Sequence, residues 1–187
     1  MKVLIIGADG FIGKNLYQRL LNFSNIELNK ITRKTSNKKL IELIHSSKII
    51  FHFAGANREK KIINFSKKNF LFTKKLCEIL KTKKNKTKFI FASTTHINKK
   101  TPYGVSKKNA EKALIGINKK FIDLYIYRLP NVFGKWAKPN YNSVVATFCY
   151  KLIHNQKINI IDGRKKLNLI YIDDLVKIIL EIILDTK

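Results

Sequence analysis

Tyr103 and Lys107 are the residues whose types and spacing most clearly suggest chemistry. They frame the stretch Tyr103-Gly-Val-Ser-Lys107, and on a helix this four-residue spacing puts a phenol and an ammonium on one face. A nearby cation lowers the pKa of a phenol and prepares it to donate a proton. With 7 Tyr and 33 Lys in 187 residues, about 1.2 such pairs arise by chance, so their location must support the assignment.

Hydroxyl groups are expected beside this pair. The strand predicted at 88–92 is followed by Ser93, Thr94 and Thr95, and Tyr103 opens the next predicted helix. Ligands of α/β folds bind at the carboxyl ends of parallel strands. The phenol, the ammonium and the hydroxyls are therefore expected at one ligand-binding edge.

A glycine-rich turn stands between the first predicted strand and the first predicted helix. It reads Gly7-Ala-Asp-Gly10-Phe11-Ile12-Gly13. Glycines allow a tight turn and a close approach of backbone to a pyrophosphate, and a helix N-terminus offers free N–H groups to the phosphates. This strand–turn–helix context predicts a dinucleotide site.

The residues that follow the second predicted strand favour NADPH over NADH. Folds that prefer NAD carry an acidic residue there, ~20 residues beyond the glycines, which binds the ribose 2′-hydroxyl. Here Arg33 and Lys34 occupy that place and could neutralise a 2′-phosphate. Glu27 lies close to the expected distance beyond the glycines, but it stands at the start of the strand, at the edge away from the cofactor.

Strand and helix patterns alternate along the chain. Apolar runs predict strands at 2–6, 26–32, 48–53, 88–92, 121–127, 158–161 and 167–172, and helical spacing predicts helices at 11–21, 37–45, 62–80, 103–117, 143–154 and 173–184. Such alternation is typical of an α/β fold, here a Rossmann-like, doubly wound parallel sheet with helices on both faces. No boundary interrupts it, so residues 1–187 are expected to form a single NAD(P)-binding domain.

Composition restricts the function classes. The net charge of +26 suggests nucleic acid, but 33 Lys stand against 5 Arg, with 28 Ile and 18 Asn. These abundant residues share A/T-rich codons, and base readout favours Arg. We therefore expect codon drift and no specific nucleic-acid partner. Apolar runs are too short for a membrane helix, so we expect a cytoplasmic protein with no membrane partner.

Cysteine and histidine do not suggest a metal site. Cys77 and Cys149 lie far apart without a C-x-x-C partner, so both are expected as small buried residues. His52, on an apolar strand, is expected to be a core histidine with its hydrogen bonds satisfied. No metal is predicted.

Several motifs together resemble the extended short-chain dehydrogenase/reductase family, within its NAD-dependent epimerase/dehydratase group. They are the glycine turn, Phe53-Ala-Gly-Ala-Asn-Arg58, the Ser93-Thr94 hydroxyls, the Tyr103/Lys107 pair and Arg128-Leu-Pro-Asn-Val-Phe-Gly134. The stretch 128–152 closely resembles bacterial capsular-polysaccharide reductases of UDP-2-acetamido-2,6-dideoxy-hexos-4-uloses. The resemblance implies NADPH-dependent reduction of a UDP-linked 4-keto-6-deoxy-hexose.

The resemblance also implies roles for individual residues. Tyr103 resembles the proton donor, Lys107 the residue that binds the nicotinamide ribose and assists the phenol, and Thr94 the hydroxyl that orients the substrate oxygen. Beside Arg33 and Lys34, the implied cofactor contacts are Gly7, Gly10, Phe11, Ile12, Gly13, Ala54, Gly55 and Pro130, and the implied substrate contacts are Asn131, Asn140 and Asn142.

Two departures from the family pattern restrict this interpretation. Sugar-nucleotide dehydratases carry an acidic pair after the catalytic hydroxyl, whereas His96-Ile97 follows Thr95 here, so dehydration is disfavoured. Related reductases also continue past the position of Lys187 into more substrate lobe and a cupin domain. We therefore expect the substrate-binding segment, about 131–187, to be incomplete.

Alternative functions stay open. The chain could be a catalytically idle NADP-binding subunit, a nucleotide-sugar epimerase of the same family or, on net charge alone, a nucleic-acid binder. The expected protein partner is a second copy in a homodimer, or a separate protein that carries the cupin domain.

Overall fold

The computed structural model describes residues 1–141, 143–160, 162–164 and 166–184. It divides into two compact units, Met1–Leu129 and Pro130–Lys187. The second unit begins one residue before the segment that we expect to bind substrate. The expectation of a single domain stays a prediction.

The first unit is built on a five-stranded sheet whose neighbouring strands all pair in parallel. Its strand order is β2-β1-β3-β4-β5, which confirms the Rossmann-like α/β fold. Parallel strands covered on both faces are typically continuous apolar runs, and all four residues of β3 are buried. The strands are β1 (Lys2–Ile6), β2 (Glu27–Ile31), β3 (Ile49–His52), β4 (Thr87–Thr94) and β5 (Ile122–Leu129).

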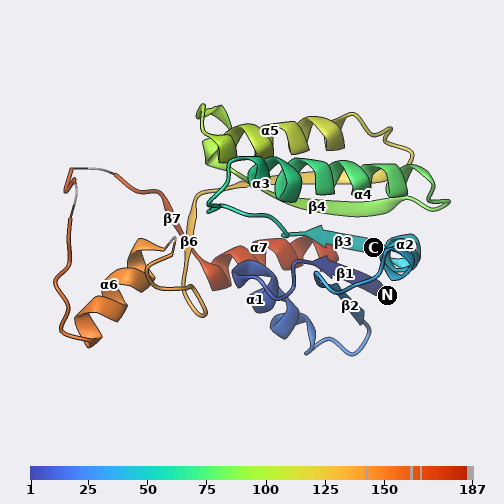
Figure 1. Ribbon diagram of the computed structural model, residues 1–187. Coiled ribbons are helices and arrows are strands. Elements are labelled where there is room, and N and C mark those ends of the chain that lie inside the picture. The colour runs from blue at the N-terminus through green and yellow to red at the C-terminus, as the bar shows by residue number, and fades with distance from the viewer. Residues whose placement is uncertain (142, 161, 165, 185–187) are drawn as a thin grey trace. The chain divides into compact units, whose positions relative to one another are not determined.

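Helices of the first unit cover both faces of this sheet. Figure 1 shows α4 and α5 side by side over one face and α1 on the other. Buried side chains of α2, α4 and α5 form one apolar core with the sheet. The helices are α1 (Phe11–Leu20), α2 (Asn37–Ser46), α3 (Ile63–Phe65), the π-helix η1 (Ser66–Leu71), α4 (Phe72–Lys81), the 3₁₀ helix η2 (Thr95–Asn98) and α5 (Pro102–Ile115).

The start of α5 is defined by its own sequence. Thr101 is the N-cap, and its hydroxyl accepts a hydrogen bond from the Gly104 amide at 3.1 Å. Pro102 follows at the first helical position, where a missing N–H costs nothing. These two residues place Tyr103 in the first turn of the helix.

The second unit has a two-stranded parallel sheet of β6 (Asn131–Phe133) and β7 (Leu169–Tyr171), with α6 (Val144–Ile153) and α7 (Ile172–Leu184). The predicted strand at 158–161 is wrong for residues 158–160, which form no strand. An apolar run forms a strand only where a neighbouring strand pairs with it. Residues 158–160 have no such pairing, and Ile160 is mostly exposed. Position 161 lies outside the described residues.

Other expectations changed in detail. The helix predicted at 62–80 is interrupted by η1. Strand β4 extends to Thr94, so Ser93 and Thr94 belong to the strand itself, and Thr95 begins η2. Cys77 is buried as expected, but Cys149 is exposed, because α6 buries none of its residues.

Membrane-spanning helices and metal-binding clusters are both absent from the described residues. No helix there has the length and apolar character needed to cross a membrane. The same residues contain no group of three or more His, Cys, Asp or Glu arranged to hold a metal ion.

Candidate functional site

The proposed catalytic residues of the first unit are close together. Thr94 is the last residue of β4, and its hydroxyl accepts the His96 amide at 3.2 Å. Burial raises the pKa of the Tyr103 phenol, and hydrogen bonding with the Thr94 side chain, which favours the charged form, opposes part of that rise.

Lys107 lies one helical turn after Tyr103 and is buried. Its ammonium donates a hydrogen bond to the Ala92 carbonyl at 2.5 Å and lies 4.4 Å from the centre of the Phe91 ring. Burial lowers the pKa of Lys107 to about 8, and Glu111 opposes this shift. Lys107 therefore begins to lose its proton at a pH only slightly above neutral.

Burial has the largest effect on the pKa of the Tyr103 phenol, and the electrostatic role expected of Lys107 stays a prediction. Burial raises the pKa of the Tyr103 phenol, and the hydrogen bond with Thr94 is what opposes that rise. Removal from water disfavours the charged form of any titratable group. The helical spacing placed the cation correctly, but it carried no information on burial.

The glycine turn has the geometry of a cradle for phosphate. A Cβ on Gly13 would lie 2.2 Å from the Gly7 carbonyl oxygen, and a Cβ on Gly7, whose φ is +94°, would lie 2.5 Å from the Ala54 nitrogen. Gly10 is the N-cap of α1 and provides no side-chain cap, and the first turn, with Phe11 and Ile12, has no acidic residue. The amides at this helix end therefore suit the pyrophosphate of a dinucleotide.

The segment after β3 connects this cradle to the catalytic residues. Ala54 donates its amide to the Ile6 carbonyl at 2.9 Å. A Cβ on Gly55 would lie 2.8 Å from the side-chain oxygen of Asn69 and 3.6 Å from the Lys107 nitrogen. A side chain at position 55 would therefore displace the Asn69 amide, whereas 3.6 Å from Lys107 is an ordinary van der Waals distance.

Sequence reasoning missed Asn69. It is buried within the π-helix η1, and its side chain accepts the Ala56 amide at 2.7 Å while donating to the Ala56 carbonyl and the Ser106 hydroxyl, each at 2.9 Å. It thus joins the segment after β3 to α5. The sequence did contain a signal for it: Asn69 occupies a core-facing position in the helical pattern predicted at 62–80, where an apolar residue is usual.

Arg33 and Lys34 lie in an exposed turn directly after β2. Arg33 contributes, after Lys68 and Asn64, to a lowered pKa of Glu59, so a carboxylate already lies within its electrostatic reach.

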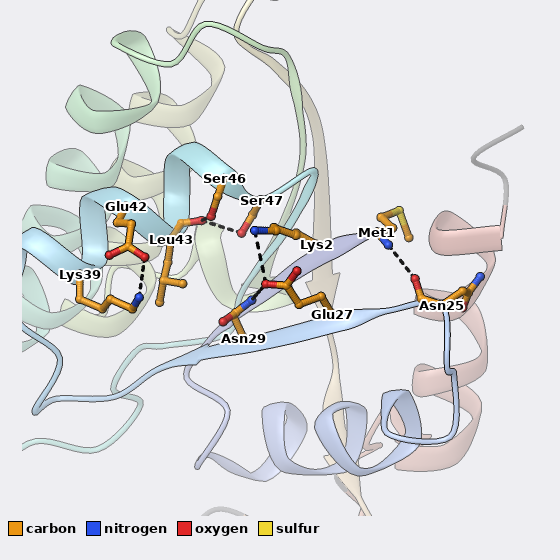
Figure 2. Close-up of polar contacts among 10 residues, drawn as sticks. All are labelled: Met1, Lys2, Asn25, Glu27, Asn29, Lys39, Glu42, Leu43, Ser46 and Ser47. Carbon is orange, nitrogen blue, oxygen red and sulfur yellow. Dashed lines mark hydrogen bonds and ion pairs between the residues drawn. The ribbon is translucent and has the colours of Figure 1, made fainter.

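The objection raised by Glu27 is answered by geometry. Glu27 pairs in register with Lys2 at the start of both strands, and the two side chains form an ion pair at 3.5 Å, with Asn29 beside them (Figure 2). The glycine turn follows the opposite end of β1. Glu27 is therefore at the wrong edge of the sheet to bind the cofactor's ribose.

The remaining predicted site residues belong to the second unit. The backbone amide of Asn131 donates to the backbone carbonyl of Asn168 at 3.2 Å. The backbone amide of Asn140 donates to the Thr147 hydroxyl at 3.0 Å. Pro130 is the first residue of this unit. Asn142 lies outside the described residues. Both hydrogen bonds are donated by backbone amides and lie within the second unit.

The sequence also gave no sign of a half-buried ion pair between Glu111 and Arg128. The Arg128 side chain donates from Nε and Nη2 to the two carboxylate oxygens, at 3.2 and 2.8 Å. Glu111 follows Lys107 by four residues on α5. That spacing was visible in the sequence, but the partner on β5 was not.

His52 is a core residue, as predicted, but only one of its ring nitrogens is paired. Its Nε2 lies 2.9 Å from the Thr73 hydroxyl, which donates to the Asn69 carbonyl at 2.6 Å. Nε2 must therefore carry the proton, and Nδ1 is left buried without a partner. Burial, with a smaller effect of Lys107, lowers the pKa of His52 to about 3.

This shift predicts acid sensitivity. The unfolded chain binds a proton at His52 below about pH 6.5, whereas the folded protein does so only near pH 3, so stability falls as pH decreases through this window. Between about pH 7 and about pH 4.5 we expect a loss of about 2 kcal/mol from His52. His52→Gln keeps a donor for Thr73 but cannot titrate, so urea unfolding at both pH values should show a smaller loss.

The exposed His154 provides the control. His154→Gln should keep the pH dependence of the parent protein. If the free energy of unfolding fell equally with pH in the parent protein and in His52→Gln, His52 would not be the source of the acid sensitivity.

Comparisons with known proteins agree with this fold. The sequence model of the NAD dependent epimerase/dehydratase family matches residues 3–187. The UDP-2-acetamido-2,6-beta-L-arabino-hexul-4-ose reductase of Pseudomonas aeruginosa is 40% identical over 183 residues, which cover 97% of this chain and 49% of that protein. The chain therefore spans about half the length of this relative.

Solved structures give the same result. The capsular polysaccharide assembling protein CapF of Staphylococcus aureus matches with a TM-score of 0.85 and 34% identity, over all of this chain and 50% of that one. The UDP-glucuronic acid 4-epimerase of Bacillus cereus, solved with UDP-glucuronic acid and NAD, matches with a TM-score of 0.87 at 23% identity, over 100% of this chain and 74% of that one. The second likeness supports the fold alone. The chain belongs to the NAD-dependent epimerase/dehydratase family.

Proposed function

We propose that the chain catalyses, or supplies the cofactor half of, the NADPH-dependent reduction of a UDP-activated 4-keto-6-deoxy-hexose for capsular or surface polysaccharide. The observation that carries the proposal is the hydrogen-bonded Thr94–Tyr103 pair beside Lys107, in a chain 40% identical to a reductase named for such a keto-sugar. A cytoplasmic location and a homodimer or cupin-containing partner stay predictions.

In the proposed reaction, the glycine turn would hold NADPH, which would supply the hydride for the keto carbon. Tyr103 would donate its proton to the oxygen of that carbon, so that the carbonyl becomes an alcohol. Thr94 holds the oxygen beside the phenol, and the phenolate is reprotonated from solvent. Lys107, charged below about pH 8, stabilises the phenolate while it lasts.

The reaction can be tested directly. Incubation with UDP-2-acetamido-2,6-dideoxy-hexos-4-ulose and NADPH should consume NADPH and give a product that has gained two hydrogens, as followed by absorbance and mass spectrometry. An epimerised sugar without net consumption of NADPH would favour the epimerase. NADPH binding without turnover would favour an idle subunit.

Cofactor preference gives a separate prediction. NADPH should bind more tightly than NADH by calorimetry, because Arg33 and Lys34 follow β2 where a carboxylate would select NAD. Arg33→Ala should weaken NADPH about tenfold, the scale of one charge-assisted hydrogen bond, and leave NADH unchanged.

Lys84→Ala makes the same change of charge at an exposed position after α4 and should leave both affinities unchanged. Equal affinities of the parent protein for NADPH and NADH would refute the preference.

A further inference from the structure

Glu111 is a buried carboxylate next to the proposed catalytic lysine. Its side chain is only 4% exposed, whereas the side chain of its partner Arg128 is 54% exposed. A carboxylate removed from water is costly unless it is paired and hydrogen-bonded. The bidentate contact with Arg128 meets this requirement and keeps the pKa of Glu111 below its ordinary value despite burial.

The position of this carboxylate relates it to the site. On α5, Glu111 follows Lys107 by one helical turn, so the two side chains are neighbours on one face. Arg128 stands on β5 in register with Ser93 of β4, the residue before Thr94. The ion pair therefore joins the helix that carries Tyr103 to β5, the strand that pairs with the one carrying Thr94.

Lys107 contacts neutral groups at its tip, namely the Ala92 carbonyl and the Phe91 ring. The titratable and charged groups that face it are Tyr103 and Glu111 on α5, Arg128 on β5 through Glu111, and His52 on β3. His52 is neutral above about pH 3. Among these groups Glu111 supplies the negative charge near neutral pH.

We propose that Glu111 is a positioning residue whose carboxylate, held by Arg128, keeps Lys107 protonated while Tyr103 gives up its proton. Without the carboxylate, no negative charge among these groups would offset the cost of burying the ammonium. Lys107 would then lose its proton near neutral pH. The inference rests on the proposed function for the role of Tyr103, but the charge state of Lys107 can be measured without any substrate.

The test is a titration of Lys107 by NMR in protein labelled with ¹³C at lysine Cε, the signal being assigned by its absence in Lys107→Met. Glu111→Gln keeps the shape but removes the charge, and it should lower the pKa of Lys107 by about one pH unit or more. A purely structural role predicts the opposite sign, because a loosened site would hydrate Lys107 and raise its pKa toward 10.5. An unchanged or raised pKa therefore overturns the proposal.

Two further variants complete the design. Glu78→Gln removes an exposed glutamate of α4 and should leave the titration of Lys107 unchanged. If Glu111→Gln does not fold, the double variant Glu111→Gln with Arg128→Met decides: it removes both charges and leaves neither one buried and unpaired. The pKa of Lys107 should again fall, and no fall would overturn the proposal.

Activity then separates the two hypotheses. In an active protein, the reaction rate declines at high pH as Lys107 loses its proton. In Glu111→Gln this decline should begin at a lower pH, by the same shift as the pKa of Lys107 measured by NMR. A shifted titration in a chain that reduces no keto-sugar would reject the proposed function and leave the role of Glu111 intact.

Discussion

Replacing Tyr103 with phenylalanine should lower the turnover of the UDP-keto-sugar by about 10²-fold or more, the usual scale for loss of a general acid. The ring stays, so its packing near Phe65, with ring centres 6.3 Å apart, is kept. The proton for the developing alkoxide is lost. Steady-state kinetics should show the fall, and calorimetry should show nearly unchanged NADPH binding.

A second tyrosine provides the matched control for this variant. Tyr125 is exposed on β5, and Tyr125→Phe should leave turnover unchanged. Thr94→Val should also slow the reaction, because it removes the hydrogen bond that opposes the raised pKa of the phenol. Full turnover by Tyr103→Phe would remove Tyr103 from the mechanism.

Gly13→Ala should abolish NADPH binding and lower the free energy of unfolding by about 3 kcal/mol, the upper part of the usual range for overpacking. The added Cβ would lie 2.2 Å from the Gly7 carbonyl oxygen and 2.9 Å from the Ala8 Cα. Both are backbone atoms, so neither can rotate away as a side chain could. The turn must move, and the helix amides then no longer face the pyrophosphate.

Gly116→Ala is the control for this substitution. Gly116 ends α5 with φ −71°, and its nearest neighbour to an added Cβ lies at 3.4 Å. This variant should bind NADPH normally and unfold at the same or a slightly higher urea concentration. NADPH affinity retained by Gly13→Ala would show that the glycine turn does not hold the cofactor.

Local patterns in the sequence predicted most of the first unit. Apolar runs and helical spacing depend on neighbouring residues, and they gave the five parallel strands and the order of the helices. The glycine turn, Thr94 and Tyr103 then fell at the carboxyl ends of β1 and β4 and at the start of α5, because parallel strands share one such edge. The same local signals failed at 158–160, where pairing depended on a partner strand.

Tertiary structure alone decided the electrostatics of the candidate site. A four-residue spacing placed Lys107 near Tyr103, but burial set the direction in which each pKa moves. The bonds of Asn69 to Ala56 and Ser106, and of Glu111 to Arg128, join residues 13 to 37 positions apart. Amino-acid order determines periodicity and turn chemistry, whereas desolvation and distant partners exist only after the chain has folded.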